Sequence, residues 1–523
     1  MFGRTFGIGT DGFEAMAIVA CVRTVQFAAV RLENRAGRGL LPSLWGRFWQ
    51  EATGYACILE SGKTGRYTLA GMRPEEVLIG KGRKWRVLAQ QGGTWAEMSA
   101  GEGQPLETVR GWLGAFRAPQ PEAGPEMGGG IIGYWAYDVA RSLEKLPDLA
   151  EDDLALPDYL FMRFEEFWIA DHEERALYLM IHTPADPAWS PEELAVRHAE
   201  ARRKAERMAR RWEEWRADAD GPDRMKLARM RRKIEEDGPD LDVAALPGLV
   251  TSMSPALFQT AVLKVQDYIR RGDVFQVNLS LRQSLPAGAS AEDLYEWLRL
   301  VNPSPYMGML RTPDFALVSA SPELLIRLKD GLMTTRPIAG TRRRGRTPAE
   351  DAAMEQELLA CEKERAEHIM LVDLLRNDLG RAAAYGTVRV PELFTIERYS
   401  HVMHLVSEVE ARLAPGRDAF DAVAAVFPGG TITGAPKIRT MEIIEELEPV
   451  RRGPYTGSMG WIDYAGNMAL NIIIRTMVIK DGICHVQSGA GIVIDSDPRR
   501  EFKECLNKSR ALWKAWQYAQ GSI

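Results

Sequence analysis

Two predicted β-hairpins constrain the fold of this chain more than any other feature. Asp330-Gly331 separates the apolar runs of residues 315–338, and Asp481-Gly482 separates those of residues 468–494. An Asp-Gly pair between apolar strands is a strong signal for an antiparallel hairpin. Helices and further strands surround the hairpins without a regular βαβ rhythm. We therefore expect an α+β fold, with layered antiparallel β-sheets and helices packed outside.

The chain divides into three parts by the character of its sequence. Its 523 residues exceed the usual size of a single hydrophobic core. Residues 1–185 contain short strands and turns, residues 186–253 form a charged helical segment with a linker, and residues 254–516 are densest in strands and glycines. Mixed charges on a helix are typical of a solvated face. We therefore place the chemistry in residues 254–516.

Composition argues against several classes of protein. The net charge of −6 disfavours a nucleic-acid binder, because such proteins usually carry a basic face. No apolar run reaches the roughly 18 residues that span a bilayer, and we find no convincing signal peptide. The five cysteines are scattered without metal-type spacing, which indicates a reducing compartment. We expect a cytoplasmic protein that binds neither membrane nor nucleic acid.

One acidic cluster lies in a predicted helix that continues to about Asn377. Glu364 and Glu367 lie on one helix face together with His368, because they are three and four residues apart. This face continues an apolar stripe, and a buried carboxylate is costly unless it is paired or binds a metal. An internal salt bridge, to the basic residues that flank Glu364, is the alternative interpretation.

A second acidic cluster follows a predicted helix start at Asp497-Pro498. Glu501 and Glu504 lie in the first two turns, where acidic residues also occur simply because they favour the helix dipole. A Mg²⁺ ion prefers a few carboxylates together with substrate oxygens. The two glutamate pairs, one from each helix, would suit such an ion.

An arginine and several glycine-rich turns are candidates for binding anions. Arg475 lies in an apolar run that we expect to be a strand covered on both faces, where it needs an anion from the protein or from a ligand. The turns of residues 427–437 and 487–493 offer backbone N–H groups, but neither matches a Walker A or Rossmann motif. Together with the glutamates, these features suit a small polycarboxylate substrate.

The stretch "RPIAGTRRRG" joins a predicted strand to a predicted helix. Gly340 and Thr341 can offer an N–H group and a hydroxyl to a ligand, whereas Ala339 offers only room. The arginine run of residues 342–344 is expected to be a solvated loop. Thr347, followed by proline, predicts an N-cap for the helix that follows.

The motifs of residues 255–515 resemble, in order, those of the chorismate-utilising enzymes. The matching stretches are "SPELL", "RPIAGTRRRG", "EKERAEHIMLVDLLRNDLGR", "YSHVMHLVSEV", "FPGGTITGAPKIRTMEIIEELEP", "NIIIRT" and "GAGIVIDSDPRREFKE". Near the N-terminus, "CILESG" and "GGIIGYWAYD" are similar to the aminating members. The resemblance implies a fold like that of anthranilate synthase component I.

The resemblance also implies a role for each candidate residue. Glu367 and Glu504 would hold Mg²⁺, which binds the ring carboxylate of chorismate, and Glu364 and Glu501 would support them. The substrate would be bound by Tyr455, Arg475, Gly489, Ala490 and Gly491 at the enolpyruvyl carboxylate, by Gly340 and Thr341 at the ring, and by Thr433 and Lys437. Glu323 would be the general acid that protonates the departing 4-hydroxyl. His404 would take part in a later proton transfer, or would be a core histidine.

The resemblance indicates ammonia as the nucleophile. Relatives that add water use a lysine base where this chain has Gln276, and glutamine cannot deprotonate water. No glutamine amidotransferase motif is present, so ammonia would come from a separate glutamine amidotransferase subunit or from free ammonium salts.

Two aminating members of the family then remain. "FQVNLS", "PGGTITGAPK" and "YTGSMGW" resemble aminodeoxychorismate synthase component I, and anthranilate synthase component I is the alternative. Ala339 replaces a lysine that attacks the substrate covalently in some aminodeoxychorismate synthases. A non-catalytic module that binds an aromatic acid is a third interpretation, which the retained glutamates disfavour.

A second pocket is also implied by the resemblance. "CILESG" and "NPSPYM" are similar to segments that bind tryptophan in relatives. Ser61, Pro305, Tyr306 and Met307 would line that pocket, as a feedback site or as a purely structural one.

Overall fold

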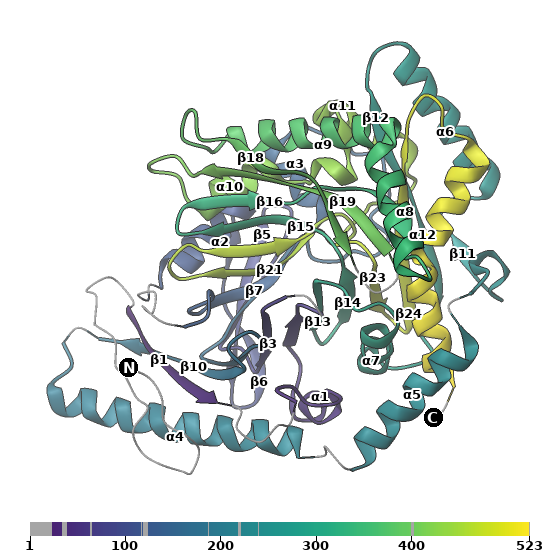
Figure 1. The fold of residues 1–523 in the computed structure, drawn as a ribbon. Helices are drawn as coiled ribbons and strands as arrows, with labels where there is room; N and C mark the ends of the chain where they lie inside the picture. Colours follow the sequence, from purple (N-terminus) through teal and green to yellow (C-terminus); the bar gives the residue numbers. More distant parts are fainter. Residues whose placement is uncertain are drawn as a thin grey trace.

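The computed structural model describes residues 24–33, 39–62, 65–116, 118, 124–186, 188–217, 221–238, 240–398 and 402–521. These residues form two large antiparallel β-sheets with helices around them (Figure 1).

The first sheet contains twelve described strands. Its order is β1 (Thr24–Glu33), β10 (Ala176–Ala185), β9 (Glu166–Asp171), β3 (Tyr67–Met72), β2 (Ala56–Glu60), β13 (Tyr306–Arg311), β14 (Phe315–Ser321), β23 (Thr476–Lys480), β24 (Ile483–Ile492), β12 (Gln276–Pro286) and β11 (Val250–Thr251), and β20 (Gly434–Ala435) also pairs with β12.

The second sheet also contains twelve described strands. Its order is β17 (Ile338–Arg343), β19 (Val402–Arg412), β16 (Leu332–Thr335), β15 (Leu324–Lys329), β22 (Met468–Asn471), β21 (Ser458–Asp463), β7 (Gly130–Trp135), β8 (Tyr159–Arg163), β4 (Glu76–Lys81), β5 (Lys84–Gln91) and β6 (Thr94–Glu102), and β18 (Arg389–Arg398) pairs with β19. Both sheets therefore combine strands from residues 24–185 with strands from the second half of the chain.

Helices cover the outer faces of both sheets. Buried residues of α1 (Gly46–Glu51), α4 (Pro191–Arg216), α7 (Ala291–Val301) and α12 (Pro498–Gln520) pack with the first sheet, and those of α2 (Pro105–Gly114), α9 (Glu362–Gly380), α10 (Ala419–Val426) and α11 (Lys437–Leu447) pack with the second. A third cluster joins the two sheets directly, with Cys57 and Leu317 from the first and Ile132 and Trp461 from the second. The predicted α+β layers are confirmed (Figure 1).

The remaining helices are short or lie at the edges of the layers. They are α3 (Ala140–Leu143), α5 (Pro222–Asp237), α6 (Pro255–Arg270), α8 (Pro348–Ala360) and the 3₁₀ turns η1 (Tyr137–Val139), η2 (Val243–Ala245) and η3 (Gly430–Ile432). Among the described residues, no helix is long and apolar enough to cross a membrane.

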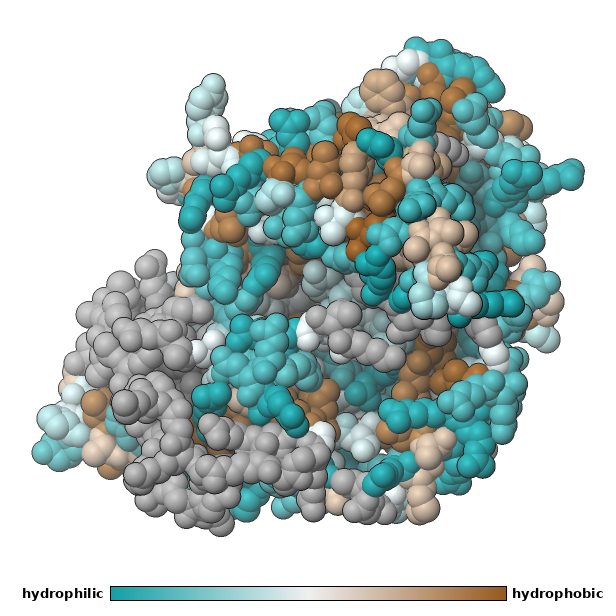
Figure 2. All heavy atoms as spheres, viewed as in Figure 1, coloured by the Kyte–Doolittle hydropathy of each residue, from teal (hydrophilic) through white to brown (hydrophobic). Residues whose placement is uncertain are grey.

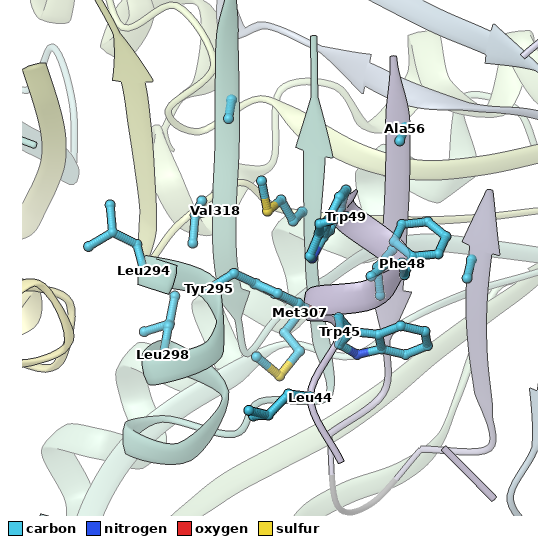
Figure 3. Packing of buried hydrophobic residues seen from close by; sticks show 14 of the residues in the cluster. Leu44, Trp45, Phe48, Trp49, Ala56, Leu294, Tyr295, Leu298, Met307 and Val318 are labelled. Atoms are coloured by element: carbon cyan, nitrogen blue, oxygen red, sulfur yellow. The ribbon is translucent and has the colours of Figure 1, made fainter. Parts of the chain in front are cut away.

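Aromatic side chains of α1 and α7 make much of the core below the first sheet. Trp45, which precedes α1, and Phe48 and Trp49 within α1 face Leu294 and its neighbours on α7, with strand residues between them (Figure 3). Edge-to-face ring pairs, such as Trp45 with Phe48 at 5.7 Å, add to the area they bury. This packing fixes the strands on which the sites described below depend.

The charged segment forms α4 and α5, as its sequence predicts. Ser190 and Glu193 make a capping box at the start of α4. Buried residues including Met208, Trp212 and Trp215 recur along one face of α4 and pack against the first sheet. The charged residues occupy the other face, and the surface along α5 is mainly hydrophilic (Figure 2). The charges therefore solvate exposed helix faces.

Both Asp-Gly hairpins are present, but the strands that enter them are shorter than predicted. Asp330 and Gly331 have φ of 50° and 76°, and Asp481 and Gly482 have φ of 50° and 74°, which is the conformation that Asp-Gly favours in tight hairpins. The predicted first strand of each hairpin is split. β14 lies in the first sheet and β15 in the second, while β22 lies in the second and β23 in the first.

The predicted long helix is two helices. Thr347 caps α8 by accepting a hydrogen bond from the N–H of Glu350, as expected. Glu350 in turn accepts a bond from the N–H of Arg346. The helix then breaks at Cys361, whose extended backbone (ψ 104°) ends α8 and begins α9.

Candidate active site

The site is built where the chain crosses twice between the two sheets. Glu323 lies in the β14–β15 crossover and Arg475 in the β22–β23 crossover. The N–H of Ile472 donates to the carbonyl of Glu323, and the N–H of Ala320 donates to the carbonyl of Arg475, both at 3.0 Å. These bonds hold the two crossovers side by side, so residues far apart in sequence become neighbours.

Arg475 does not lie within a strand, contrary to the prediction. β22 ends at Asn471 and β23 begins at Thr476, and Arg475 has a positive φ of 52°. Such a conformation is uncommon for a residue with a side chain and persists only where its surroundings impose it. The apolar sequence on both sides reflects burial at a crossover and not a covered strand.

Glu323 has the environment of a proton donor. It is 8% exposed and accepts a 2.7 Å hydrogen bond from the hydroxyl of Thr431. Burial raises the pKa of the Glu323 carboxyl to about 7, although the Thr431 bond and the charges of Arg475 and Lys508 act in the opposite direction. A carboxyl group with a pKa near 7 can hold and release a proton at neutral pH.

Arg475 brings positive charge to the same place. Burial lowers the pKa of its guanidinium, while the neighbouring Tyr455, Glu504 and Glu323 favour the charged form. Arg475 is therefore near three other residues that the sequence analysis singled out. Such a largely desolvated cation is suited to a carboxylate ligand.

Gly489 and Gly491, which have no side chains and which we call the glycine recess, adjoin these groups. β12 and β24 pair Asn278 with Gly491 and Ser280 with Gly489. A side chain at Gly489 would collide with the amide oxygen of Asn278 and come within 2.9 Å of the Tyr455 hydroxyl, and one at Gly491 would collide with the amide of Gln276. Only glycine fits this close packing. Ala490 is 1% exposed and packs into the apolar cluster of α6, away from the recess.

The candidate metal ligands lie at the starts of α9 and α12. Asp497 caps α12, as predicted, by accepting bonds from two backbone N–H groups. Glu364 lies 3.0 Å from where a Cβ of Gly340 would be, and Glu504 lies 3.9 Å from the ammonium of Lys508. In the described part of the chain, no group of three or more His, Cys, Asp or Glu is placed to hold a metal. The carboxylate oxygens present are nevertheless the ligand type that Mg²⁺ prefers.

The arginine run beside Gly340 is not the solvated loop that its sequence predicts. Its three side chains form ion pairs with α8 and α9: Arg342 with Glu357 and Glu364, Arg343 with Glu350, and Arg344 with Asp351. These pairs fasten β17 to the two helices. Glu364 is therefore paired with an arginine from a segment distant in sequence.

Gly340 forms a bulge that turns Thr341 toward a histidine. The register of β17 against β19 shifts at Gly340, whose φ is 69°. The hydroxyl of Thr341 and Nδ1 of His404 are 3.0 Å apart. Burial lowers the pKa of His404, so the ring is neutral at pH 7 and can accept a proton.

Three other predicted residues are engaged by the protein itself. The ammonium of Lys437 donates to Asp378 (2.7 Å) and to a backbone carbonyl, and the hydroxyl of Thr433 donates to the carbonyl of Gly429. His368 is fully buried against the hydroxyl of Ser407, and burial lowers its pKa to about 4. In this structure the polar groups of these side chains therefore stabilise the fold around the site.

The family follows from a comparison with known proteins. A profile of the chorismate binding enzymes matches residues 55–514. The chain belongs to this family. The geometry above is thus that of a chorismate binding enzyme, and Glu323, Arg475 and the glycine recess lie within the matched region.

Relatives of both aminating types are similar to this chain. Aminodeoxychorismate synthase component 1 of Bacillus subtilis is 44% identical over 88% of this chain and 92% of its own. Anthranilate synthase component 1 of Thermus thermophilus is 48% identical over 76% of this chain and 80% of its own. The crystal structure of anthranilate synthase component I from Streptococcus pneumoniae has a TM-score of 0.67 and 32% identity, and covers 86% of this chain and 92% of that one.

A cavity of about 790 Å³ adjoins the Glu323 segment of this chorismate binding enzyme. Ser61, Pro305, Tyr306 and Met307 all line it, so the structure brings the predicted second pocket together. Met307 also belongs to the core of α1 and α7 (Figure 3). The two residues that flank Glu323 in sequence, Pro322 and Leu324, line the cavity as well. A ligand there would touch the segment that carries Glu323.

Two polar residues of the site were missed in the sequence. Lys508 donates to the carbonyl of Gly489 at 2.9 Å, and Thr431 binds Glu323. Lys508 follows Glu504 by four residues, so helical spacing could have placed both on one face of α12. Thr431 lies in the glycine-rich turn of residues 427–437, but its contact with Glu323 spans 108 residues and could not be predicted.

Proposed function

We propose that this protein is component I of an aminodeoxychorismate synthase, which converts chorismate and ammonia to 4-amino-4-deoxychorismate in p-aminobenzoate and folate biosynthesis. The presence of Gln276 is the observation that supports amination. Its amide lies over Gly491 at the edge of the recess, where relatives that add water have a lysine base. A glutamine cannot remove a proton from water, whereas ammonia needs no such base to be nucleophilic.

The recess and its charges support chorismate as the substrate. We assign the enolpyruvyl carboxylate to Arg475, Tyr455 and the backbone at Gly489 and Gly491, because a buried cation and the Tyr455 hydroxyl adjoin these glycines. Gly340 and Thr341 would line the ring.

The proposal includes Mg²⁺ as the cofactor. Glu367 and Glu504 would hold it, with Glu364 and Glu501 in support, and the bound ion would neutralise the ring carboxylate. The two pairs lie near the starts of α9 and α12, and the assignment requires that one ion reach both.

Glu323 would supply the proton for the leaving group. The C4–O bond breaks as the hydroxyl receives this proton and departs as water, a C–N bond forms at C4 with ammonia, and the added nitrogen loses one proton, which balances the one that Glu323 gave. Burial of Glu323 favours the protonated form that this step needs. His404, neutral and beside Thr341, could take a proton from the ring in an aromatising reaction.

Anthranilate synthase component I is the second candidate. It would place nitrogen at C2 and expel pyruvate. The 48% identity to the Thermus thermophilus anthranilate synthase and the fold of the Streptococcus pneumoniae one favour it, as does Ala339 in place of a lysine. The motifs "FQVNLS", "PGGTITGAPK" and "YTGSMGW" favour the aminodeoxychorismate type.

The enzymatic proposal is tested by following chorismate. The purified chain is mixed with chorismate, Mg²⁺ and an ammonium salt, and the absorbance of chorismate is recorded. We expect it to fall only when both Mg²⁺ and ammonium are present. A chain that binds chorismate but never consumes it would contradict the proposal and support a binding module.

The ammonia donor is proposed to be a separate glutamine amidotransferase subunit. The name component 1, which the relatives carry, supports a second component. Glutamine should therefore not replace the ammonium salt for this chain alone. Turnover with glutamine alone would contradict this assignment.

Ala339 leads us to expect no covalent bond between substrate and protein. Alanine has no nucleophile, and the residue lies in β17 directly before Gly340. When the enzyme is quenched during turnover, its intact mass should be unchanged. The Ala339→Lys variant is the matched comparison, because it restores the lysine found in some relatives. A mass increase in the unaltered protein would contradict the non-covalent route.

The cavity that adjoins the Glu323 segment is proposed to bind tryptophan. Its volume of about 790 Å³ falls in the usual range of about 300–1,000 Å³ for small-ligand sites. The Ser61 hydroxyl is held by the backbone of Tyr67, and Tyr306 enters from β13. Tryptophan at saturating concentration should raise the melting temperature, and Tyr306→Ala should remove this effect. An unchanged melting temperature in the unaltered protein would contradict the assignment.

A further inference from the structure

A buried ion pair contacts the strand beside the two glycines, in a segment to which the proposed function assigns no role. Arg452 follows α11 and pairs with Glu448 through two nitrogens, at 2.7 and 2.9 Å. Their side chains are 1% and 3% exposed. Removing such a pair from water is costly, and apolar residues of similar size would often be at least as stable. The pair therefore calls for an explanation other than stability.

The remaining donors of Arg452 reach segments that build the site. Its guanidinium donates to the carbonyl of Asn278 at 2.7 Å and to that of Ile432 at 2.9 Å. It also lies 5.6 Å from the ring centre of Tyr455 and 5.0 Å from that of Tyr137. One planar cation thus contacts β12, η3 and the tyrosine assigned to the substrate carboxylate.

Glu448 also binds β12, at Ser280. It accepts hydrogen bonds from both the N–H and the hydroxyl of Ser280, each at 2.8 Å. The hydroxyl of Ser280 also receives a 2.9 Å bond from the amide of Gln487 on β24. Ser280 pairs with Gly489, and Asn278 pairs with Gly491. The ion pair therefore holds β12 at the two positions opposite the glycines.

We infer that Arg452, together with Glu448, is a positioning residue that holds the Tyr455 ring and the β12 backbone in place beside Gly489 and Gly491. This inference rests on the proposed function, because it assumes that a carboxylate of chorismate occupies the recess. The planar guanidinium suits the role, since its donors point in fixed directions toward several acceptors at once. Lysine would keep the charge and lose this geometry.

The Arg452→Lys variant tests the inference, because its KM and its kcat should change by different amounts. We expect the KM for chorismate to rise roughly tenfold, the effect of losing about one well-placed charged hydrogen bond. The kcat should change much less, because Arg452 does not touch the reacting atoms. Amide hydrogen exchange should also become faster in residues 277–281 and 488–492.

The matched control is Arg163→Lys in β8. Arg163 is also buried, pairs with Glu76 at 3.3 Å and stacks over Phe116 at 4.3 Å, but it contacts no residue of the site. Its variant should lower the melting temperature and leave the KM unchanged. An Arg452→Lys variant that behaves in the same way would overturn the inference.

A milder variant covers the case in which Arg452→Lys does not fold. Ser280→Ala removes one hydroxyl that binds Glu448, and we expect a smaller rise of the KM. No rise would overturn the inference. If the unaltered protein never consumes chorismate, the proposed function fails. Amide hydrogen exchange still tests the inference in that case. Exchange around Gly489 that is the same in the variants as in the unaltered protein would overturn it.

Discussion

Replacing Glu323 with glutamine is expected to lower kcat by roughly 10²–10⁴-fold, the usual contribution of a general acid. Glutamine matches glutamate in size and can still accept the hydrogen bond from Thr431, so the fold should persist. It has no acidic proton for the departing hydroxyl. Steady-state kinetics with chorismate and ammonium measure the loss, and a variant with normal kcat would contradict the role of Glu323.

The same carboxyl group sets a pH dependence. Because burial raises the pKa of Glu323 to about 7, the protonated acid is lost as the pH rises above 7, and kcat should fall on that alkaline side. The Thr431 bond favours the ionised form. Thr431→Val should therefore raise the pKa of Glu323 and shift the alkaline fall in kcat to higher pH. A fall in kcat at the same pH in the variant and in the unaltered protein would contradict this assignment.

Replacing Glu504 with glutamine is expected to lower Mg²⁺-dependent turnover strongly. A neutral amide is a poorer ligand for a hard cation, and a metal that stabilises developing charge is worth several kcal/mol, so we expect a loss of roughly 10²-fold or more. Glu504 is half-exposed, so its loss should not unfold the chain. Mg²⁺ titration by calorimetry gives a readout that is independent of activity.

Glu362→Gln is the matched control for the metal site. Glu362 is the first residue of α9 and is exposed. It has the same charge as the proposed ligands and lies at the same end of the helix, but its side chain leaves the helix in another direction. We expect this variant to bind Mg²⁺ and to turn over normally. Equal losses in both variants, or full activity in Glu504→Gln, would refute the metal assignment.

Local features of the fold could be predicted because their causes are local. The Asp-Gly turns need only two residues with positive φ, and the caps at Thr347 and Asp497 need only a side chain beside free N–H groups. The same reasoning missed the two crossovers. An apolar run looks the same whether it continues as one strand or passes from one sheet to the other.

Only some features of the site could be predicted from the sequence, for a related reason. Motifs identified Glu323 and Arg475, but their closeness depends on pairing between the two crossovers, which are about 150 residues apart. Lys437 looked like a ligand in a glycine-rich turn, yet its ammonium is taken by Asp378 on another helix. Whether a charged side chain meets substrate or protein is decided by such distant partners.

Identification of the product tests the central claim most directly. The purified chain is incubated with chorismate, Mg²⁺ and ammonium, and half of the mixture then receives an aminodeoxychorismate lyase. We predict p-aminobenzoate and pyruvate only in the half that received the lyase. Anthranilate fluorescence with pyruvate released before any lyase is added would contradict the account and establish the second candidate.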